Sequence, residues 1–526
     1  MASVASPRAR AFPRPGALPS SFVLAALALV GLFAVSAYLR TNSLGESLWM
    51  DEGLSIGIAS QPLFDIPGTL RVDGSPPLYY MLLSVWMDVF GRGPADTQAL
   101  SVAISLVAIP GGLWAGWSLF GRRAGLFCAA LCAVNPFLTT YAQETRMYSL
   151  MLVLSLLATA AFLNVFALGR RRYLPLFAVL LAAMLYTHNW GLFLGVGLVL
   201  ALVPCWYVSE VRSSFWKDAL IGFGFAGLLY LPWLPTLLHQ IQHTGAPWLN
   251  SPNFGAPVQI SKSLLGGGTP TVALVLAGGS GLAAVIARRA EDKERTAMVA
   301  GAVIVLGTLA VAWLVSQVSP AWTTRYLGVL LGPMLLVAAL GLARAGALGM
   351  VALVIVFGIW AIPKSYGLEN KSNASDLRKA VVPELREGDL VLSMQPEQGP
   401  LLAYHFEDLG GAPDLRFGSP LGRVENDRVM DWTDGYERMQ DASVERNLDP
   451  LVDNLPAGGH VLIVHPVTSR ADDWDAPWTE LVRRRSAQWG AALAQDPRLE
   501  RVAAVPPNYR RATRIGVRGV LYEKTG

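Results

Sequence analysis

Eleven apolar runs occupy most of the first 362 residues of this 526-residue chain. Each approaches the roughly 20 residues that an α-helix needs to cross the hydrocarbon core of a bilayer. Hydrophobic residues make up 53% of the chain and charged residues only 15%, a balance typical of integral membrane proteins. The sequence therefore predicts a polytopic α-helical membrane protein with runs near 22–39, 97–120, 124–141, 147–168, 173–188, 191–208, 217–238, 270–287, 297–317, 324–343 and 347–362.

The density of charge changes after the last of these runs. Charged residues become frequent from Ala374 onward, and no later run could span a bilayer. Short apolar segments with strand character then occur near 389–394, 460–465 and 515–523, and helical spacing near 479–495. We expect an N-terminal cytoplasmic tail, a transmembrane domain and an extracytoplasmic soluble α/β domain, at 1–21, 22–369 and 370–526 respectively.

A twelfth apolar segment, 78–90, decides how the later runs face. It has thirteen residues and ends near Asp88, so we compared both topologies by the excess of Lys and Arg expected on the cytoplasmic side. If 78–90 lies on the membrane surface, fifteen of the 21 Lys and Arg residues before 364 are cytoplasmic; if it crosses, only seven are. We therefore expect an interfacial helix at 78–90, one external loop at 40–96 and a plasma-membrane protein.

Adjacent carboxylates at Asp51 and Glu52 stand in this external loop. One interpretation is helix capping, because an acid is favourable near the positive end of a short helix. The other is catalysis, because Trp49 and Met50 would press the acids against an apolar surface. A partly desolvated carboxylate has a raised pKa and is a better general base.

The same loop continues with Asp73 and a double proline followed by Tyr79 and Tyr80. The prolines preset the start of the interfacial helix, and tyrosines commonly sit at the depth of the lipid headgroups. These structural roles leave Asp73 unexplained, so we retain it, with the two tyrosines, as a candidate for binding substrate.

Further polar residues lie at external ends of the expected spans. Glu144 and Arg146 occupy one junction and form either a structural pair or, for the arginine, a phosphate site, to which a guanidinium is suited. Arg325, next to Tyr326, begins a late span, where a buried cation needs an anion. Weaker candidates are His188, which is as well explained by a structural role, and Lys262 in the external loop 239–269.

Together these residues place acids, cations and aromatic rings on one side of the membrane. That combination fits a polyprenyl-phosphate sugar donor whose phosphate is held by arginine while Asp51 deprotonates an acceptor hydroxyl. In-line displacement at the anomeric carbon would invert its configuration. Asp51, Glu52 and Asp73 also offer the oxygen ligands that a divalent cation prefers, and we leave that cofactor open. The small net charge of +4 gives no reason to expect nucleic acid as a partner.

The order of these motifs resembles the GT-C superfamily, closest to bacterial enzymes of the protein O-mannosyltransferase and aminoarabinose-transferase type. The resemblance rests on the Asp51-Glu52 pair, on the run Pro76-Pro77-Leu78-Tyr79-Tyr80, on Gln143-Glu144-Thr145-Arg146-Met147-Tyr148 and on Arg325-Tyr326. Many family sequences have His before the double proline, where this chain has Ser75.

The resemblance implies an inverting glycosyltransferase that uses a polyprenyl-phosphate donor, with Asp51 as catalytic base and Arg146 and Arg325 on the donor phosphate. It implies mannose first and arabinofuranose second as the sugar, and a glycan, lipid or protein as acceptor. Two other classes remain open: a transporter or flippase of a lipid-linked sugar, and a membrane-anchored binding protein acting through its C-terminal domain. Transporters favour polar residues near the midplane, whereas the charges here cluster at one surface.

Overall fold

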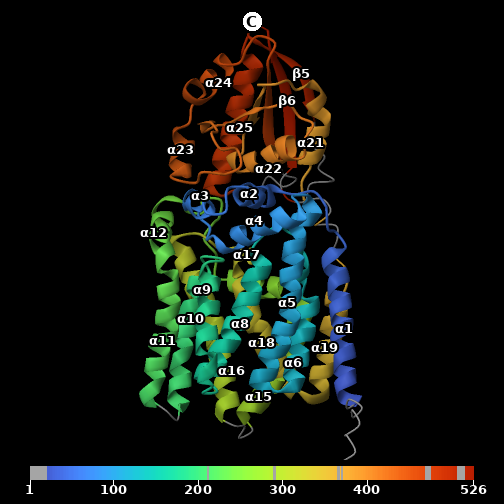
Figure 1. The fold of residues 1–526 in the computed structure, drawn as a ribbon, viewed down its shortest axis with the longest axis vertical. Coiled ribbons are helices and arrows are strands. Elements are labelled where there is room, and N and C mark those ends of the chain that lie inside the picture. Colours follow the sequence, from blue (N-terminus) through green and yellow to red (C-terminus); the bar gives the residue numbers. More distant parts are fainter. Residues whose placement is uncertain are drawn as a thin grey trace, which may run out of the picture.

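A computed structural model describes residues 20–209, 212–287, 292–363, 368, 371–467, 475–505, 514 and 516–525. The expected N-terminal tail therefore lies outside the described residues except for its last two positions. The described chain forms a long helical bundle with a smaller domain of mixed helices and strands at one end (Figure 1). We name that end of the bundle the domain-side end.

The bundle is built from the apolar runs. Among the described residues, eight helices are long and apolar enough to cross a membrane, and a ninth crossing results if the pair α6 and α7, bent by 47°, is one span. These helices make a multi-pass membrane protein. Their bounds are α1 Ser20–Thr41, α5 Pro94–Phe120, α6 Arg122–Val134, α7 Pro136–Ala142, α8 Tyr148–Phe166, α10 Gly191–Val208, α11 Arg212–Tyr230, α12 Leu234–His243, α14 Gly268–Ala273, α15 Gly279–Ala287, α16 Asp292–Val318, α17 Thr324–Leu327 and α18 Leu331–Arg344.

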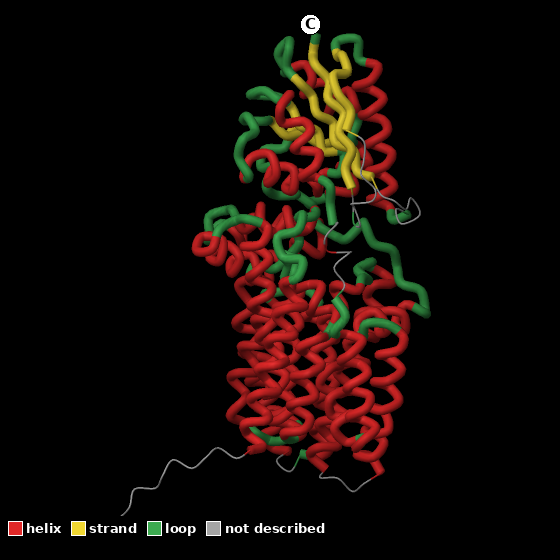
Figure 2. The backbone as a smooth tube through the Cα atoms, turned by 90° about the vertical axis from the view of Figure 1, so that its right-hand side faces the viewer, coloured by secondary structure: helices red, strands yellow, loops and turns green. Residues whose placement is uncertain are grey.

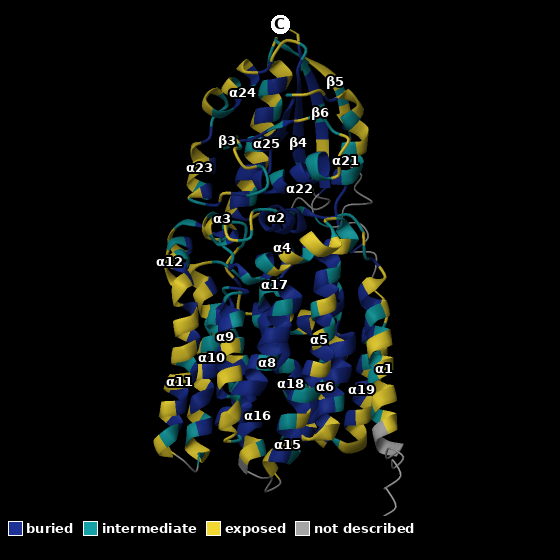
Figure 3. Cartoon of the chain, viewed as in Figure 1, coloured by how far each residue is buried: buried dark blue, intermediate teal, exposed yellow. Residues whose placement is uncertain are grey.

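Two of the eleven expected spans are shorter than a full crossing. Helix α9 (Leu174–Leu185) has 12 residues and α19 (Gly346–Trp360) has 15, against the roughly 20 that span a bilayer. Both run beside the longer helices in the bundle (Figure 1). Helix α8 is buried at the centre of the bundle, while α1 and α11 expose apolar side chains on its outside, where lipid would cover them (Figure 3).

Three short helices lie between the bundle and the C-terminal domain: α2 (Met50–Ala59), α3 (Ile66–Asp73) and α4 (Leu78–Phe90). Helix α4 has the bounds expected for the interfacial helix and lies across the domain-side end instead of along the bundle (Figure 1). Proline at positions 76 and 77 precedes it, as a preset helix start requires. These helices form a platform on which the C-terminal domain rests.

The C-terminal domain contains a six-stranded sheet in the order β3-β2-β1-β4-β6-β5. Strand β1 pairs in parallel with β2 and β4, whereas β6 is antiparallel to both β4 and β5. The strands lie at one end of the molecule, beyond the domain-side end of the bundle (Figure 2). They run β1 Leu390–Ser393, β2 Arg416–Ser419, β3 Gly422–Arg423, β4 His460–Val467, β5 Leu499–Val505 and β6 Gly516–Lys524.

Helices surround this sheet. The longest, α25, packs on β4 and buries Trp489 and Leu493 in the core of the domain. The apolar spacing of 479–495 produces this buried face. The helical segments among the described residues of the domain are α21 Ala374–Val381, η5 Val382–Glu384, η6 Pro396–Gln398, α22 Gly399–Ala403, η7 Tyr404–Asp408, α23 Gly435–Asp441, η8 Val444–Leu448, α24 Asp449–Asp453 and α25 Pro477–Gln495.

The C-terminal domain and α2 are in close backbone contact. A Cβ at Gly53 would lie 2.6 Å from the Cα of Leu401, and one at Gly57 would overlap the carbonyl oxygen of Arg428. A single cluster of buried apolar side chains continues from the bundle into the domain. The two parts are therefore packed like one folded unit, with α2 between them.

The external loop expected at 239–269 also reaches the C-terminal domain. His243 Nδ1 lies 2.9 Å from Asp434 Oδ1, and the Trp478 N–H donates to the Pro247 carbonyl at 3.1 Å. The rings of Trp248 and Trp432 pack against each other with centroids 4.5 Å apart and planes tilted by 49°. These contacts fasten the segment before α13 (Ala256–Leu264) to the domain above it.

Candidate functional site

Asp51 lies on the first turn of α2, at the junction of the bundle and the C-terminal domain. Its Oδ2 is 2.5 Å from Nη1 of Arg325, and both side chains are largely buried, with 8% and 17% of their surface exposed. Arg325 comes from α17, 274 residues later in the chain. The guanidinium also stands near the rings of Trp49 and Tyr326, 5.6 and 5.5 Å from their centroids.

A second guanidinium, from Arg146, approaches the same turn of α2. Its Nη1 donates to the Asp51 carbonyl oxygen at 3.2 Å and to Ser55 Oγ at 3.1 Å. The group is buried and lies 5.7 Å from the Tyr148 ring centroid. Among the described residues, neither Nε of Arg146, nor that of Arg325, nor Nε1 of Trp49 has a hydrogen-bond partner. Buried donors without partners are rare and call for an acceptor.

Glu52 is fully buried and lies on the opposite side of the α2 turn from solvent. Its Oε2 is 2.6 Å from Nζ of Lys371 and accepts from the Trp49 N–H at 3.2 Å. Its Oε1 accepts from Gln98 Nε2 at 3.1 Å and from the Thr145 N–H at 2.9 Å. Burial raises the pKa of Glu52, and Lys371 opposes that rise. With four donors around it, Glu52 caps α2 and ties it to its neighbours.

Glu144 has a similar environment. It is fully buried, and its Oε1 lies 2.6 Å from Nη2 of Arg514, a residue near the C-terminus. The Arg514 guanidinium stacks over Trp49 at 4.5 Å from the centroid, and its backbone N–H donates to the Lys371 carbonyl at 3.3 Å. Segments from both ends of the C-terminal domain thus supply the counter-ions for Glu52 and Glu144.

The loop residues singled out in the sequence lie near this cluster. Asp73 ends α3, and burial raises the pKa of its carboxyl, with Ser75 as its hydrogen-bond partner. Tyr79 and Tyr80 are fully buried on α4, and burial raises the pKa of both phenols. The hydroxyl of Tyr79 is 3.1 Å from Ser101 Oγ, which fixes it to α5.

His188 closes the site from the junction of α9 and α10. Its Nδ1 accepts from the Trp190 N–H at 3.1 Å. Burial and the nearby Arg146 and Arg325 lower its pKa to about 3, so the ring is neutral at physiological pH. The His188 and Tyr326 rings lie 4.9 Å apart. His188 therefore lines the site as an uncharged ring and does not act as a cation.

Lys262 is not brought into the cluster. Its side chain is exposed on α13, and it takes part in none of the hydrogen bonds or ion pairs that join the described residues around Asp51. The acids also fail to converge as a metal site: within the described ranges, no group of three His, Cys, Asp or Glu side chains is placed to hold an ion. The trio Asp51, Glu52 and Asp73 is instead divided among different partners.

Sequence reasoning missed Lys371 and Arg514. Each pairs with an acid more than 300 residues away, at separations of 319 and 370 residues. Charged residues are common in this part of the chain, and nothing in their local sequence distinguishes these two. The only signal was indirect, since buried Glu52 and Glu144 each require a cation.

Comparison with known proteins shows which solved structures share this fold. No protein-family model and no curated protein matches this sequence. The crystal structure of ArnT from Cupriavidus metallidurans in the apo state is similar with a TM-score of 0.56 at 12% identity, over 96% of this chain and 98% of that one. ArnT bound to undecaprenyl phosphate gives 0.57 at 12% identity, over 95% and 97%. The chain has the GT-C fold.

A more distant likeness supports the same fold. The Archaeoglobus fulgidus oligosaccharyltransferase in complex with Zn and sulfate has a TM-score of 0.51 at 13% identity, over 83% of this chain and 67% of that one. The expectation of a GT-C-like helical membrane protein with a C-terminal α/β domain is confirmed. Near-complete coverage of ArnT includes the C-terminal domain, so the GT-C fold here comprises both parts.

Proposed function

We propose that this chain is a membrane glycosyltransferase that moves a sugar from a polyprenyl-phosphate donor to an acceptor hydroxyl, with inversion at the anomeric carbon. The observation that carries the proposal is the Asp51–Arg325 ion pair with the Arg146 guanidinium against the same helical turn. A carboxylate paired with one guanidinium, beside a second guanidinium on the same helical turn, can supply both a base and an anion site. The fold shared with ArnT, crystallised with undecaprenyl phosphate, supports a lipid-phosphate donor.

The arginines suit a phosphate in both geometry and charge. Each retains a buried Nε–H without a partner among the described residues, and a guanidinium binds phosphate through parallel hydrogen bonds. Arg325 lies at the domain-side end of its span, which we propose is the extracytoplasmic membrane surface. A lipid tail would extend from there along the exposed apolar helices, and the headgroup would reach Asp51.

Donor binding would also free the base. In the structure Arg325 Nη1 lies 2.5 Å from Asp51 Oδ2. When the donor phosphate takes the Arg325 hydrogen bonds, Oδ2 can accept the proton of the acceptor hydroxyl. The acceptor oxygen then bonds to the anomeric carbon from the face opposite the phosphate, the bond from that carbon to the phosphate oxygen breaks, and polyprenyl phosphate leaves as an anion held by arginine.

The remaining residues of the cluster position these groups. Glu52 and Glu144 are held by Lys371 and Arg514 and fix the turn of α2 and the junction before α8. Both oxygens of Glu52 accept hydrogen bonds from its neighbours, so Glu52 is a positioning residue in this proposal. Tyr326 and the neutral His188 ring pack beside Arg325 and limit access of water.

Replacing Asp51 with Asn tests the assignment. The amide keeps the shape of the side chain but cannot accept the proton, so transfer should fall about 10²–10⁴-fold, the usual contribution of a general base. The assay follows transfer from polyprenyl-phosphate mannose, then from polyprenyl-phosphate arabinofuranose, by the full chain in lipid nanodiscs. Asp73→Asn is the comparison variant, since Asp73 is a nearby acid without a proton-transfer role in the proposal. Wild-type turnover in Asp51→Asn would reject Asp51 as base.

A further inference from the structure

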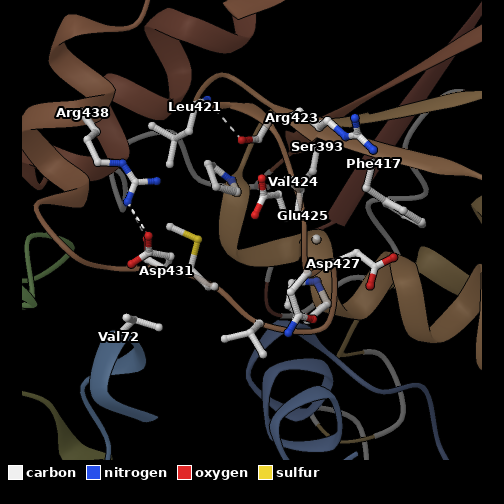
Figure 4. A pocket seen from close by; sticks show the side chains of 18 of the residues that line it. Val72, Ser393, Phe417, Leu421, Arg423, Val424, Glu425, Asp427, Asp431 and Arg438 are labelled. Carbon is white, nitrogen blue, oxygen red and sulfur yellow. Dashed lines mark hydrogen bonds and ion pairs between the residues drawn. The ribbon is translucent and has the colours of Figure 1, made fainter. Parts of the chain in front are cut away.

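A cavity of about 440 Å³ lies on the far side of α2 from the arginines, between the C-terminal domain and α3. Figure 4 shows the loop 417–431 above it and the platform helices below, with Val72 of α3 at its lower edge. The proposed transfer reaction does not use this space. Its volume lies within the range of small-molecule sites.

The cavity stands at the carboxyl ends of two parallel strands. Ser393 ends β1 and Ser419 ends β2, and both line it. Ligands of α/β sheets bind in the crevice at this edge, because the loops that follow the strands diverge there. The sheet thus opens toward the platform at the position where a ligand site is expected.

The lining carries charges of both signs: Arg423, Arg438, Glu425, Asp427 and Asp431. Arg438 is paired with Asp431 at 2.8 Å. The backbone of Arg423 pairs with Gly418 in the β2–β3 ladder, but the side chains of Arg423 and Glu425 make no hydrogen bond or ion pair with any described residue, and both stand around the cavity in Figure 4. With three acids against two arginines, this lining has no excess of positive charge and does not suit a phosphate. It suits a neutral ligand whose hydroxyls both donate and accept.

Apolar surfaces complete the lining. Phe417, Leu421 and Met430 face the same space, and the C–H face of a sugar ring packs on such surfaces while its hydroxyls reach polar groups at the edge. A hydroxylated ring therefore suits both the apolar and the polar lining, whereas a fully apolar ligand would use none of the polar groups, among them the exposed side chains of Arg423 and Glu425.

The cavity is joined to Asp51 through the first turns of α2. Met430 lines the cavity and packs in one cluster with Leu54. Pro396 also lines it, and the preceding Gln395 places its Nε2 3.4 Å from Met50 Sδ. Asp51 directly follows Met50 in the sequence, so the proposed base and the cavity lie on two sides of the short helix α2.

We propose that this cavity binds a non-reacting sugar unit of the acceptor, and that the acceptor is a neutral glycan longer than one unit. The inference rests on the proposed transferase function and adds the acceptor class. A unit held in the cavity would orient the chain, and a hydroxyl farther along it would meet Asp51 beside α2.

Direct binding tests the site without the reaction. Neutral di- to tetrasaccharides of mannose, glucose and galactose are titrated against the full chain in nanodiscs by calorimetry. The variant Arg423→Ala/Glu425→Ala should bind the oligosaccharides at least about tenfold more weakly, because the loss of each polar contact raises the dissociation constant several-fold. Glu500→Ala/Arg501→Ala changes an exposed pair of the same charges on edge strand β5 and should bind as wild type does.

The outcomes separate the two proposals. Oligosaccharide binding that depends on Arg423 and Glu425, in a protein without transferase activity, would reject the proposed function and retain the site. In an active enzyme, the cavity variant should raise the KM for the acceptor and leave kcat and the KM for the donor unchanged. Absence of binding up to about 10 mM, equal binding by both variants, or binding of inorganic phosphate in competition with the sugars would each overturn the glycan site.

Discussion

Replacing Lys371 with Met probes the deepest contact between the C-terminal domain and the bundle. The Lys371–Glu52 pair has 1% and 0% of its side chains exposed. Methionine retains the length of the side chain and removes its charge, so the carboxylate of Glu52 loses its only cationic contact among the described residues. Removing one partner of a buried ion pair costs about 3–5 kcal/mol, because the remaining charge stays desolvated.

The pH dependence of the loss has a definite sign. Burial already holds the pKa of Glu52 above its ordinary 4.5, and losing Lys371 raises it further. The folded variant then keeps a proton that the unfolded chain has released, so its stability falls as pH rises above about 4.5. Lys371→Met should therefore be closest to wild type in acid and weakest at neutral pH.

The measurement is the free energy of unfolding in mixed micelles across pH 5 to 8, followed by tryptophan fluorescence. Lys379→Met provides the comparison, because Lys379 is exposed on α21 in the same domain. Adding Glu52→Gln to Lys371→Met should recover part of the loss, since it removes the unpaired charge. If Lys371→Met unfolds like Lys379→Met at every pH, the buried pair does not hold the two parts together.

Two further substitutions test other parts of the interface. Gly57→Ala should lower the free energy of unfolding by about 1–3 kcal/mol, because its Cβ would overlap the Arg428 carbonyl. Gly68→Ala on α3, which has open space around it, should leave the free energy of unfolding unchanged. Equal unfolding of both variants would show that α2 is not tightly docked. Burial and a hydrogen bond shared with Asp427 raise the pKa of Glu407 to about 7, so the folded chain binds the extra proton and Glu407 makes stability fall from pH 4.5 to 7. Glu407→Gln should flatten that slope in thermal unfolding followed against pH, and an unchanged slope would assign it to another group.

Local patterns in the sequence predict much of this fold. The interfacial helix has its expected bounds of 78–90, and the helical spacing at 479–495 falls within α25. Strand candidates at 389–394, 460–465 and 515–523 correspond to β1, β4 and β6, because buried strands are apolar runs bounded by turns. The edge strand β5 was missed: its side chains are mostly exposed, so it carries no such run.

The site was predictable only in part. Asp51, Arg146 and Arg325 stand out because charge at the end of an apolar span is costly, and the structure gathers them at one turn of α2. Their sequence neighbours do not reveal which atoms meet. Lys371 and Arg514 could not be found, since the contacts they make join distant segments and depend on how the C-terminal domain settles on the platform.

The two cations from the C-terminal region set an order of assembly. The ribosome makes α2, which carries Glu52, and the junction between α7 and α8, which carries Glu144, long before it makes Lys371 and Arg514, so the two acids precede their counter-ions in synthesis. A chain that stopped short of Arg514 would have its full set of spans and yet leave Glu144 unpaired. The junction around α2 is then the last part of the protein to mature, and under the proposed function an incomplete chain would not act on lipid-linked substrates.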